Sequence, residues 1–466
     1  MKRKFKEGFV SMDVREEILQ RYEKRTPGSK AHDAKAKKSL PGGDTRSATY
    51  YLPYPTYMDE GSGCSLKDVD GNTYIDFLNN YTSLVHGHRH PHIQEAVEKA
   101  ISHDFMYGAP CENQYKLADM ITQRLPSIDY LRFTNSGTEA TMMAIRAARA
   151  FKKREIIIKM DGCYHGSHDF VEVNISPDLS GEWLPKEKTE AGGVPACVLN
   201  AVKVARFNDL ASVEAILKKY SGQVSAIITE TVMNSAGIIP ANIDFLKGLR
   251  ALADQYDILL IFDEVATFRL SIGGMQKMTG VIPDITALGK IIGGGCFPIG
   301  AFGGRKEIMS MYDPANPSGY QHSGTFNGHN VIMSAGIAAL ELLDTTAIEH
   351  INSLGERLQC GINKAFETAG ISGFATRAGS LLNVHWTNKP VTDAIDVVMW
   401  KKQASDLPRM FHMELLNRGV FFGNRGLFNI STPMTTTDID QTVEKIGDTL
   451  MYLKPYVQEK APHLIR

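Results

Sequence analysis

The sequence predicts an α/β protein with a mostly parallel central sheet, because long apolar segments alternate with helix-like ones. Four of these apolar segments are YLRFT (130–134), EIIIKM (155–160), VSAIITE (224–230) and ILLIFDE (258–264). Helix-like stretches such as EATMMAIRAARAFKK separate them. Strands that are apolar throughout, rather than at every second position, indicate a sheet covered on both faces by helices. We therefore expect such a sheet within residues 93–325.

Smaller elements flank this region on both sides. At 466 residues the chain is long enough for two or three domains of roughly 150 residues each. The patterns predict a helix over 13–24, a loop over 25–48, a hairpin around Asp70-Gly71-Asn72, and helices over 331–342, 348–369 and 438–452. The expected division is an N-terminal arm with part of a small domain (1–65), a large domain (66–328) and a C-terminal α+β small domain (329–466).

Composition excludes several classes of protein. Lys+Arg number 51 and Asp+Glu 52, so the formal charge of -1 provides no general attraction to nucleic acid or anionic lipid. The six cysteines are scattered without a C-x-x-C pair, which favours free thiols in a reducing compartment. The basic residues 1–8 lack the apolar core of a signal peptide, and no stretch of about 18 apolar residues predicts a membrane span. We expect a cytoplasmic protein.

The first candidate site is the start of a helix that could bind phosphate. The strand at 130–134 leads into Asn135-Ser136-Gly137-Thr138-Glu139-Ala140 and then into an amphipathic helix. Ser136, Gly137 and Thr138 would present backbone N–H groups and two hydroxyls where the helix dipole favours an anion. The alternative is an ordinary Ser/Thr N-terminal cap.

Two residues at strand ends suggest further chemistry. Asp263 lies at the C-terminal end of the apolar run in ILLIFDE, where ligands of parallel sheets collect. A buried carboxylate there requires a cationic partner such as a protonated pyridine nitrogen; the alternative is a helix cap or a structural ion pair. Lys290 lies between an apolar strand and Gly293-Gly294-Gly295. Desolvation would lower the pKa of its amine and make it nucleophilic, whereas most lysines are only solvated charges.

Taken together, these motifs resemble class III aminotransferases. Ser136–Ala140, Tyr164-His165-Gly166, Asp263-Glu264-Val265 and Leu288–Gly295 follow one another in the order seen in that family. The spacing from Asp263 to Lys290 (290 − 263 = 27) is similar as well. The resemblance extends over residues 40 to 450. It implies fold type I, a pyridoxal 5'-phosphate cofactor and an obligate homodimer with its active site between the subunits.

The resemblance implies a role for each matching residue. Lys290 resembles the Schiff-base lysine and Asp263 the carboxylate on the pyridine nitrogen. The other implied cofactor contacts are Ser136, Gly137 and Thr138 at the phosphate, completed by Thr325 from the partner subunit, and Tyr164, His165, Glu230 and Val265 around the ring. Glu230 has a structural role at the strand end as its alternative. Once displaced by the donor amine, Lys290 would act as a free base that moves a proton between substrate and cofactor.

Within the family, the segment Leu40–Ser47 resembles β-amino-acid (β-phenylalanine-type) aminotransferases. The resemblance implies that Arg46 binds one carboxylate and Arg425 the α-carboxylate of a 2-oxo acid such as 2-oxoglutarate, since guanidinium binds carboxylates bidentately. A surface salt bridge is the alternative for each arginine. Tyr81 and Tyr107 could line an apolar side-chain pocket or be ordinary core aromatics.

The alternative activities on the same scaffold are glutamate-1-semialdehyde 2,1-aminomutase and an amino-acid racemase. The loop Asp263–Arg269 lacks the glycine usual between the threonine and the aromatic residue in the aminomutase, which weakens that alternative. The histidines of His86-Gly87-His88-Arg89-His90-Pro91-His92 could suggest a metal, but Gly87 and Pro91 favour a turn into a helix over 93–100. We expect no metal site.

Overall fold

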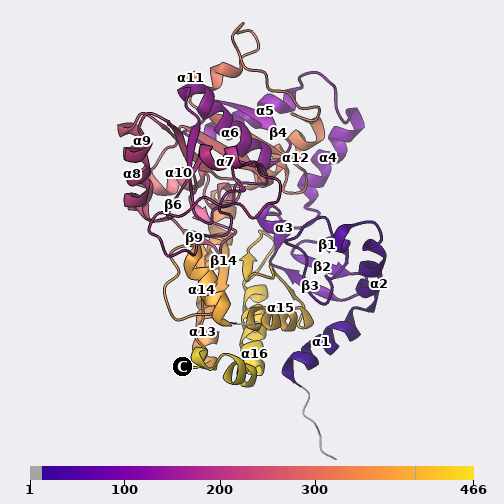
Figure 1. The fold of residues 1–466 in the computed structure, drawn as a ribbon. Helices are drawn as coiled ribbons and strands as arrows, with labels where there is room; N and C mark the ends of the chain where they lie inside the picture. The colour runs from indigo at the N-terminus through magenta and orange to yellow at the C-terminus, as the bar shows by residue number, and fades with distance from the viewer. Residues whose placement is uncertain (1–12, 405) are drawn as a thin grey trace, which may run out of the picture.

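The computed structural model describes residues 13–404 and 406–466 (Figure 1), so the basic segment 1–8 lies outside it. A seven-stranded sheet in the order β4-β12-β11-β10-β7-β5-β6 forms the centre of the large domain. Its strands are β4 (Tyr130–Thr134), β5 (Ile156–Met160), β6 (Val202–Ala205), β7 (Val224–Glu230), β10 (Leu259–Asp263), β11 (Ile285–Gly289) and β12 (Gly300–Gly304). Only β12 runs antiparallel to its neighbours, β11 and β4. The predicted mostly parallel sheet is confirmed.

Apolar side chains cover both faces of this sheet. Ile157 packs in one cluster with residues of α6 (Gly137–Lys152), whereas its neighbour Ile158 packs in the other with residues of α9 (Ile243–Gln255). Successive residues of a strand point to opposite faces. The residues that point to either face therefore have to be apolar, which is why the strands are continuous apolar runs in the sequence.

Three smaller sheets accompany the central one, and one of them joins strands from the N- and C-terminal parts of the chain. The first, in the order β1-β2-β3-β15, consists of β1 (Met58–Ser62), β2 (Ser65–Asp68), β3 (Thr73–Asp76) and β15 (Val420–Phe421). The second consists of β13 (Phe374–Ala378), β14 (Leu381–His385) and β16 (Leu427–Asn429). The third pairs β8 (Val232–Met233) with β9 (Ile239–Pro240). The hairpin predicted around Gly71 is confirmed, and its φ of 85° explains the glycine. The domain boundaries stay a prediction.

The N-terminal helices confirm one prediction and correct another. The helix predicted over 13–24 is α1 (Val14–Arg25). The loop predicted over 25–48 is wrong in part, because α2 (Pro27–Ala36) lies within it. Pro27 suits the first turn of a helix, and the Asp70 carboxylate accepts hydrogen bonds from the N–H groups of Gly28 and Ser29. The carboxylate that satisfies this helix start lies 42 and 41 positions along the chain from Gly28 and Ser29, so Pro27 was the available local signal.

The remaining helices surround the sheets (Figure 1). They are α3 (Asn79–Thr82), α4 (Pro91–His103), α5 (Glu112–Arg124), α7 (Ala196–Ala201), α8 (Leu210–Lys219), α10 (Gly274–Thr279), α11 (Lys306–Met309), α12 (Asn330–Leu342), α13 (Thr345–Ala369), α14 (Ala394–Ala404), α15 (Leu407–Asn417) and α16 (Thr436–Lys460). The helices predicted after residue 330 are confirmed as α12, α13 and α16. Over the described ranges no single helix is long and apolar enough to span a membrane; the bent pair α12 and α13 passes that test on length and composition only.

Candidate functional site

The topology brings the predicted residues to one edge of the seven-stranded sheet. Asp263 ends β10 and Glu230 ends β7, and the two residues are paired across these parallel strands. Lys290 directly follows β11, and Ser136 lies between β4 and α6. Because β4 and β11 are both antiparallel to β12, their carboxyl ends lie at the same edge. Residues from four strand ends therefore converge there.

Lys290 begins a tight turn. Its φ of 54° lies in the left-handed region, and Gly295 in the same turn has a φ of 75°. A β-carbon at Gly295 would lie 2.3 Å from the Ser83 carbonyl oxygen, so only glycine allows this close approach. Burial lowers the pKa of the Lys290 amine to about 8, although the Asp263 and Glu230 carboxylates favour its charged form. An amine with this pKa can act as a base near neutral pH.

The Asp263 carboxylate is buried and hydrogen bonded through both oxygens. Oδ2 lies 2.8 Å from Nδ1 of His165, and Oδ1 accepts the backbone N–H of Val265 at 3.0 Å. Burial lowers the pKa of His165, and the hydrogen bond to Asp263 opposes this effect. Within residues 13–404 and 406–466 no lysine or arginine lies within 4.0 Å of Asp263; its side-chain partner is His165, whose lowered pKa favours the neutral ring. A strong cationic partner for this carboxylate would have to come from a ligand.

Glu230 holds the loop that carries Tyr164. Its Oε2 accepts the backbone N–H of Tyr164 and its Oε1 that of Asn234, both at 3.0 Å. Burial, and then the neighbouring Asp263 carboxylate, raises the pKa of Glu230 to about 8. The Tyr164 residue is 41% exposed, so part of it is available to a ligand. Glu230 thus has a structural role at its strand end and also positions Tyr164.

The start of α6 combines a conventional cap with a close approach to the Asp263 loop. The Ser136 hydroxyl accepts the N–H of Glu139 at 3.1 Å, so the N-terminal cap considered for this residue is present. Thr138 Oγ1 accepts the N–H of Ser167 at 3.3 Å. A β-carbon at Gly137 would lie 3.1 Å from Val265 Cγ1. The first N–H groups of a helix have no carbonyl partner within it. These groups and Asp263 can therefore contact the two ends of one small anionic ligand.

Among the described residues, Thr325 and Tyr107 form no side-chain hydrogen bond with this cluster. Thr325 is exposed in the segment before α12, and this segment is joined to the start of α6 by the Asn135 amide, which donates to Asn327 Oδ1 at 2.9 Å. Tyr107 is 46% exposed. Within the described chain no hydrogen bond connects Tyr107 to Arg46 or Tyr81.

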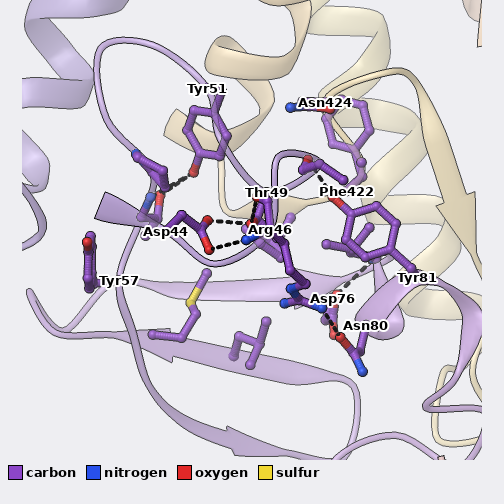
Figure 2. A pocket seen from close by; sticks show the side chains of 18 of the residues that line it. Asp44, Arg46, Thr49, Tyr51, Tyr57, Asp76, Asn80, Tyr81, Phe422 and Asn424 are labelled. Carbon is purple, nitrogen blue, oxygen red and sulfur yellow. Dashed lines mark hydrogen bonds between the residues drawn. The ribbon is translucent and has the colours of Figure 1, made fainter. Parts of the chain in front are cut away.

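Arg46 and Tyr81 do come together. They line a cavity of about 330 Å³ under residues 43–58, with Arg46 at its centre in Figure 2. Nη1 of Arg46 donates to Asn80 Oδ1 at 2.8 Å, and the guanidinium carbon lies 5.8 Å from the centroid of the Tyr81 ring. The Tyr81 hydroxyl donates to the Ala48 carbonyl at 2.5 Å.

Arg425 approaches the same tyrosine from the C-terminal part of the chain. It is exposed in the turn before β16. Burial raises the pKa of Tyr81, and the positive charges of Arg46 and Arg425 both oppose this shift. In the part of the chain that the structure describes, no carboxylate lies within 4.0 Å of either guanidinium. The surface salt bridge considered for each arginine is therefore not formed there.

Sequence reasoning overlooked Lys159, which is fully buried in β5. Its ammonium donates to the carbonyl oxygens of Cys163 at 3.0 Å, Val173 at 2.5 Å and Asn174 at 3.3 Å. Burial lowers the pKa of Lys159 to about 8. These bonds fasten the loop that carries Tyr164 to the sheet. A lysine within the otherwise apolar segment EIIIKM was the available signal.

The histidines around residue 88 form structural hydrogen bonds. His86 Nε2 lies 3.0 Å from the Ala339 carbonyl oxygen, and His88 Nε2 lies 2.8 Å from Asp76 Oδ2. Among the described residues there is no group of three or more His, Cys, Asp or Glu side chains that could hold a metal ion.

A sheet edge with a buried lysine of lowered pKa, a helix start with further free N–H groups and a carboxylate that lacks a strong cation has the groups that a pyridoxal-phosphate-dependent enzyme requires. Comparison with known proteins narrows this class. The family model "Aminotransferase class-III" matches residues 47–450. The chain therefore belongs to the class III aminotransferases.

Curated relatives of the chain are named glutamate-1-semialdehyde 2,1-aminomutase. One from Ignicoccus hospitalis is 42% identical over 83% of this chain and 89% of its own length. Another, from Methanopyrus kandleri, is 37% identical over 92% of this chain and 98% of its own length. These two proteins share the scaffold over most of both lengths.

Solved structures confirm the fold type I architecture. An ω-transaminase from Sphaerobacter thermophilus is 39% identical with a TM-score of 0.88, covering 92% of this chain and 98% of that one. A β-phenylalanine aminotransferase from Variovorax paradoxus is 32% identical with a TM-score of 0.85, covering 97% and 99%. A transaminase solved with pyridoxal phosphate bound is 35% identical with a TM-score of 0.85, covering 92% and 99%.

Proposed function

We propose that this enzyme moves an amino group from a β-amino acid, such as an aromatic one, to a 2-oxo acid such as 2-oxoglutarate. The observation that carries the proposal is Arg46, which lines the cavity beside Tyr81; Arg425 is a turn residue whose charge also acts on Tyr81. Neither has a carboxylate partner within residues 13–404 and 406–466. Two guanidinium groups that both influence one tyrosine suit a site that holds two carboxylate substrates in turn.

The residues at the sheet edge fit pyridoxal 5'-phosphate. Ser136, Gly137 and Thr138 would hold its phosphate at the start of α6. Asp263 would pair with its pyridine nitrogen, and Tyr164 and Val265 would flank its ring. When bound, the cofactor supplies an electron sink for the bond broken at the substrate carbon.

Around the cofactor, the protein holds the proton and orients the substrate. The Lys290 amine, with a pKa lowered to about 8 by burial, can accept a proton from the substrate carbon and release it again. Arg46 would fix the donor by its carboxylate, which presents the breaking C–H bond to Lys290. His165 keeps Asp263 oriented through its hydrogen bond of 2.8 Å.

The second candidate is glutamate-1-semialdehyde 2,1-aminomutase, because both curated relatives described above have that name. Those names favour the aminomutase. The two arginines and the loop from Thr267 directly to Phe268 favour the aminotransferase.

Dependence on an acceptor distinguishes the two functions. Purified holoenzyme with β-phenylalanine should lose the visible absorbance of its bound cofactor, and 2-oxoglutarate should restore it. An isomerase, whether the aminomutase or a racemase, would instead bring its substrate to equilibrium with its product without consuming any 2-oxo acid. No absorbance change with any β-amino acid, together with turnover of glutamate-1-semialdehyde alone, would replace the first proposal by the second.

A further inference from the structure

The residues of α3 form a left-handed turn, which is rare for non-glycine residues. Asn79, Asn80, Tyr81 and Thr82 have φ angles of 47°, 46°, 55° and 77°. The ψ angles of Asn80 and Tyr81 are 53° and 56°, close to those of a left-handed helix. Asparagine tolerates this conformation better than most residues, but tyrosine and threonine do not. Such a backbone persists only where its surroundings enforce it.

Buried polar groups enforce the start of the turn. Oδ1 of Asp76 accepts the backbone N–H groups of Leu78 at 2.8 Å and Asn79 at 3.0 Å. The Asn79 amide donates to the Asn429 carbonyl at 2.7 Å, and the Asn429 amide donates to the Leu78 carbonyl at 2.8 Å. Asp76, Asn79 and Asn429 are all buried. The turn is thereby attached to β16.

A buried arginine holds the end of the left-handed turn of α3. Arg269 is 1% exposed, and its guanidinium donates to the carbonyl oxygens of Thr82, at 3.1 Å, and Ile430. Across the described ranges no carboxylate lies within 4.0 Å of Arg269. An arginine buried without a carboxylate depends on its other hydrogen bonds, so the contacts with Thr82 and Ile430 hold the end of the turn in place.

The middle of the turn presents Asn80 and Tyr81 to the N-terminal arm (Figure 2). The Asn80 amide nitrogen donates to Ser83 Oγ at 3.0 Å, which directs its carbonyl oxygen to Arg46. A neutral amide orients the guanidinium without cancelling its charge, whereas an aspartate at this position would neutralise it. The turn therefore holds Arg46 in place and leaves its charge available.

We infer that Asn80, presented by this left-handed turn, is the positioning residue that fixes Arg46 for the substrate carboxylate. This inference rests on the proposed function, in which Arg46 binds that carboxylate. Asn80 then determines how strongly the enzyme prefers carboxylate-bearing donors, although it need not touch the substrate.

Calorimetric titration of the holoenzyme tests the inference without turnover. The probes are 3-phenylpropanoate and its uncharged analogue 3-phenylpropanamide. Asn80→Gly keeps the backbone conformation accessible and removes only the amide. We expect it to weaken the carboxylate about tenfold, as for loss of one hydrogen bond to a charged group, with the amide unchanged. Asn80→Asp should weaken the carboxylate further, because the new carboxylate competes for Arg46.

Two further variants test the carboxylate site itself and control for the substitution of a left-handed asparagine by glycine. Arg46→Ala should reduce carboxylate binding at least as much as Asn80→Gly does. Asn208→Gly is the matched control, because Asn208 is another left-handed asparagine (φ 62°) whose side chain bonds to Asn242 and Thr392 rather than lining the cavity. It should change neither affinity.

Other outcomes of these titrations would overturn the inference about Asn80, the proposed carboxylate site, or both. Wild-type affinity in Asn80→Gly, with loss in Arg46→Ala, would overturn the inference and leave the proposed function standing. Equal weakening of both probes in Asn80→Gly would show a merely structural role and also overturn it. No loss in Arg46→Ala, or no carboxylate binding by the wild type, would overturn the proposed carboxylate site as well.

Discussion

Replacing Glu230 by glutamine should remove a pH dependence of stability. Burial and the Asp263 carboxylate raise the pKa of Glu230 from 4.5 to about 8. Below pH 4.5 the carboxyl is protonated in both the folded and the unfolded chain. As the pH rises from 4.5 to about 8, the unfolded chain releases this proton first, so the free energy of unfolding falls. This decrease in the free energy of unfolding is complete above the pKa that Glu230 has in the folded protein.

The size of the effect follows from the shift in pKa. Each unit corresponds to about 1.4 kcal/mol, so the whole window of the Glu230 titration amounts to about 5 kcal/mol, of which about 2 kcal/mol falls between pH 6 and pH 8. Glutamine does not titrate. In glutamine, an NH₂ group replaces one of the two carboxylate oxygens that accept the N–H groups of Tyr164 and Asn234. The lost hydrogen bond changes the free energy of unfolding by the same amount at every pH.

The measurement is urea unfolding of the apoprotein at pH 6, 7 and 8, which avoids the charge of the cofactor. The free energy of unfolding of the wild type should fall by about 2 kcal/mol relative to Glu230→Gln over this range. Glu182→Gln, at an exposed position, is the control and should remain parallel to the wild type. Parallel profiles for the wild type and Glu230→Gln would refute the reasoning that burial keeps Glu230 protonated.

Three further predictions concern the cofactor. Lys290→Ala should reduce turnover by about 10²–10⁴-fold or more in a steady-state assay, because it removes the base, and near-normal turnover would exclude Lys290 from that role. Gly166→Ala should lower cofactor retention, measured by absorbance after gel filtration, because a β-carbon at this φ of 101° would lie 2.5 Å from Thr138 Oγ1; full retention would contradict the close packing. If Thr325 completes the phosphate site of a partner subunit, sedimentation should show a dimer and Thr325→Ala should weaken cofactor binding; a monomer that retains cofactor would argue against it.

The sequence was sufficient for the parts of the site that depend on strand ends. Asp263 and Lys290 each follow an apolar strand, and parallel strands place such residues at one edge whatever the details of packing. Strand β12 was not predicted, because GAFGG has little strand propensity. Its glycines are required by tertiary contact instead: a β-carbon at Gly300 would lie 2.1 Å from the Ser136 carbonyl oxygen.

The substrate side was harder to predict because its contacts join distant positions. Arg46 and Asn80 meet only because the arm lies over the turn of α3, and that turn depends on Asn429 and Arg269. No local pattern predicts four left-handed residues in succession. The pair Asn79-Asn80 was the available signal, since asparagine is enriched in this conformation.

The parallel pairing of β3 with β15 has a consequence for biosynthesis. Asp76 pairs with Phe421, about 345 residues later in the chain. At roughly 5–20 residues per second, β3 leaves the ribosome about 20 to 70 s before its partner strand does. Until then one edge of the N-terminal hairpin lacks its partner strand, and such edges invite pairing with other chains. Completion of this small sheet, which includes the contacts of the arm that carries Arg46, is therefore a late event in synthesis, so a nascent chain can form its central sheet well before it can select a substrate.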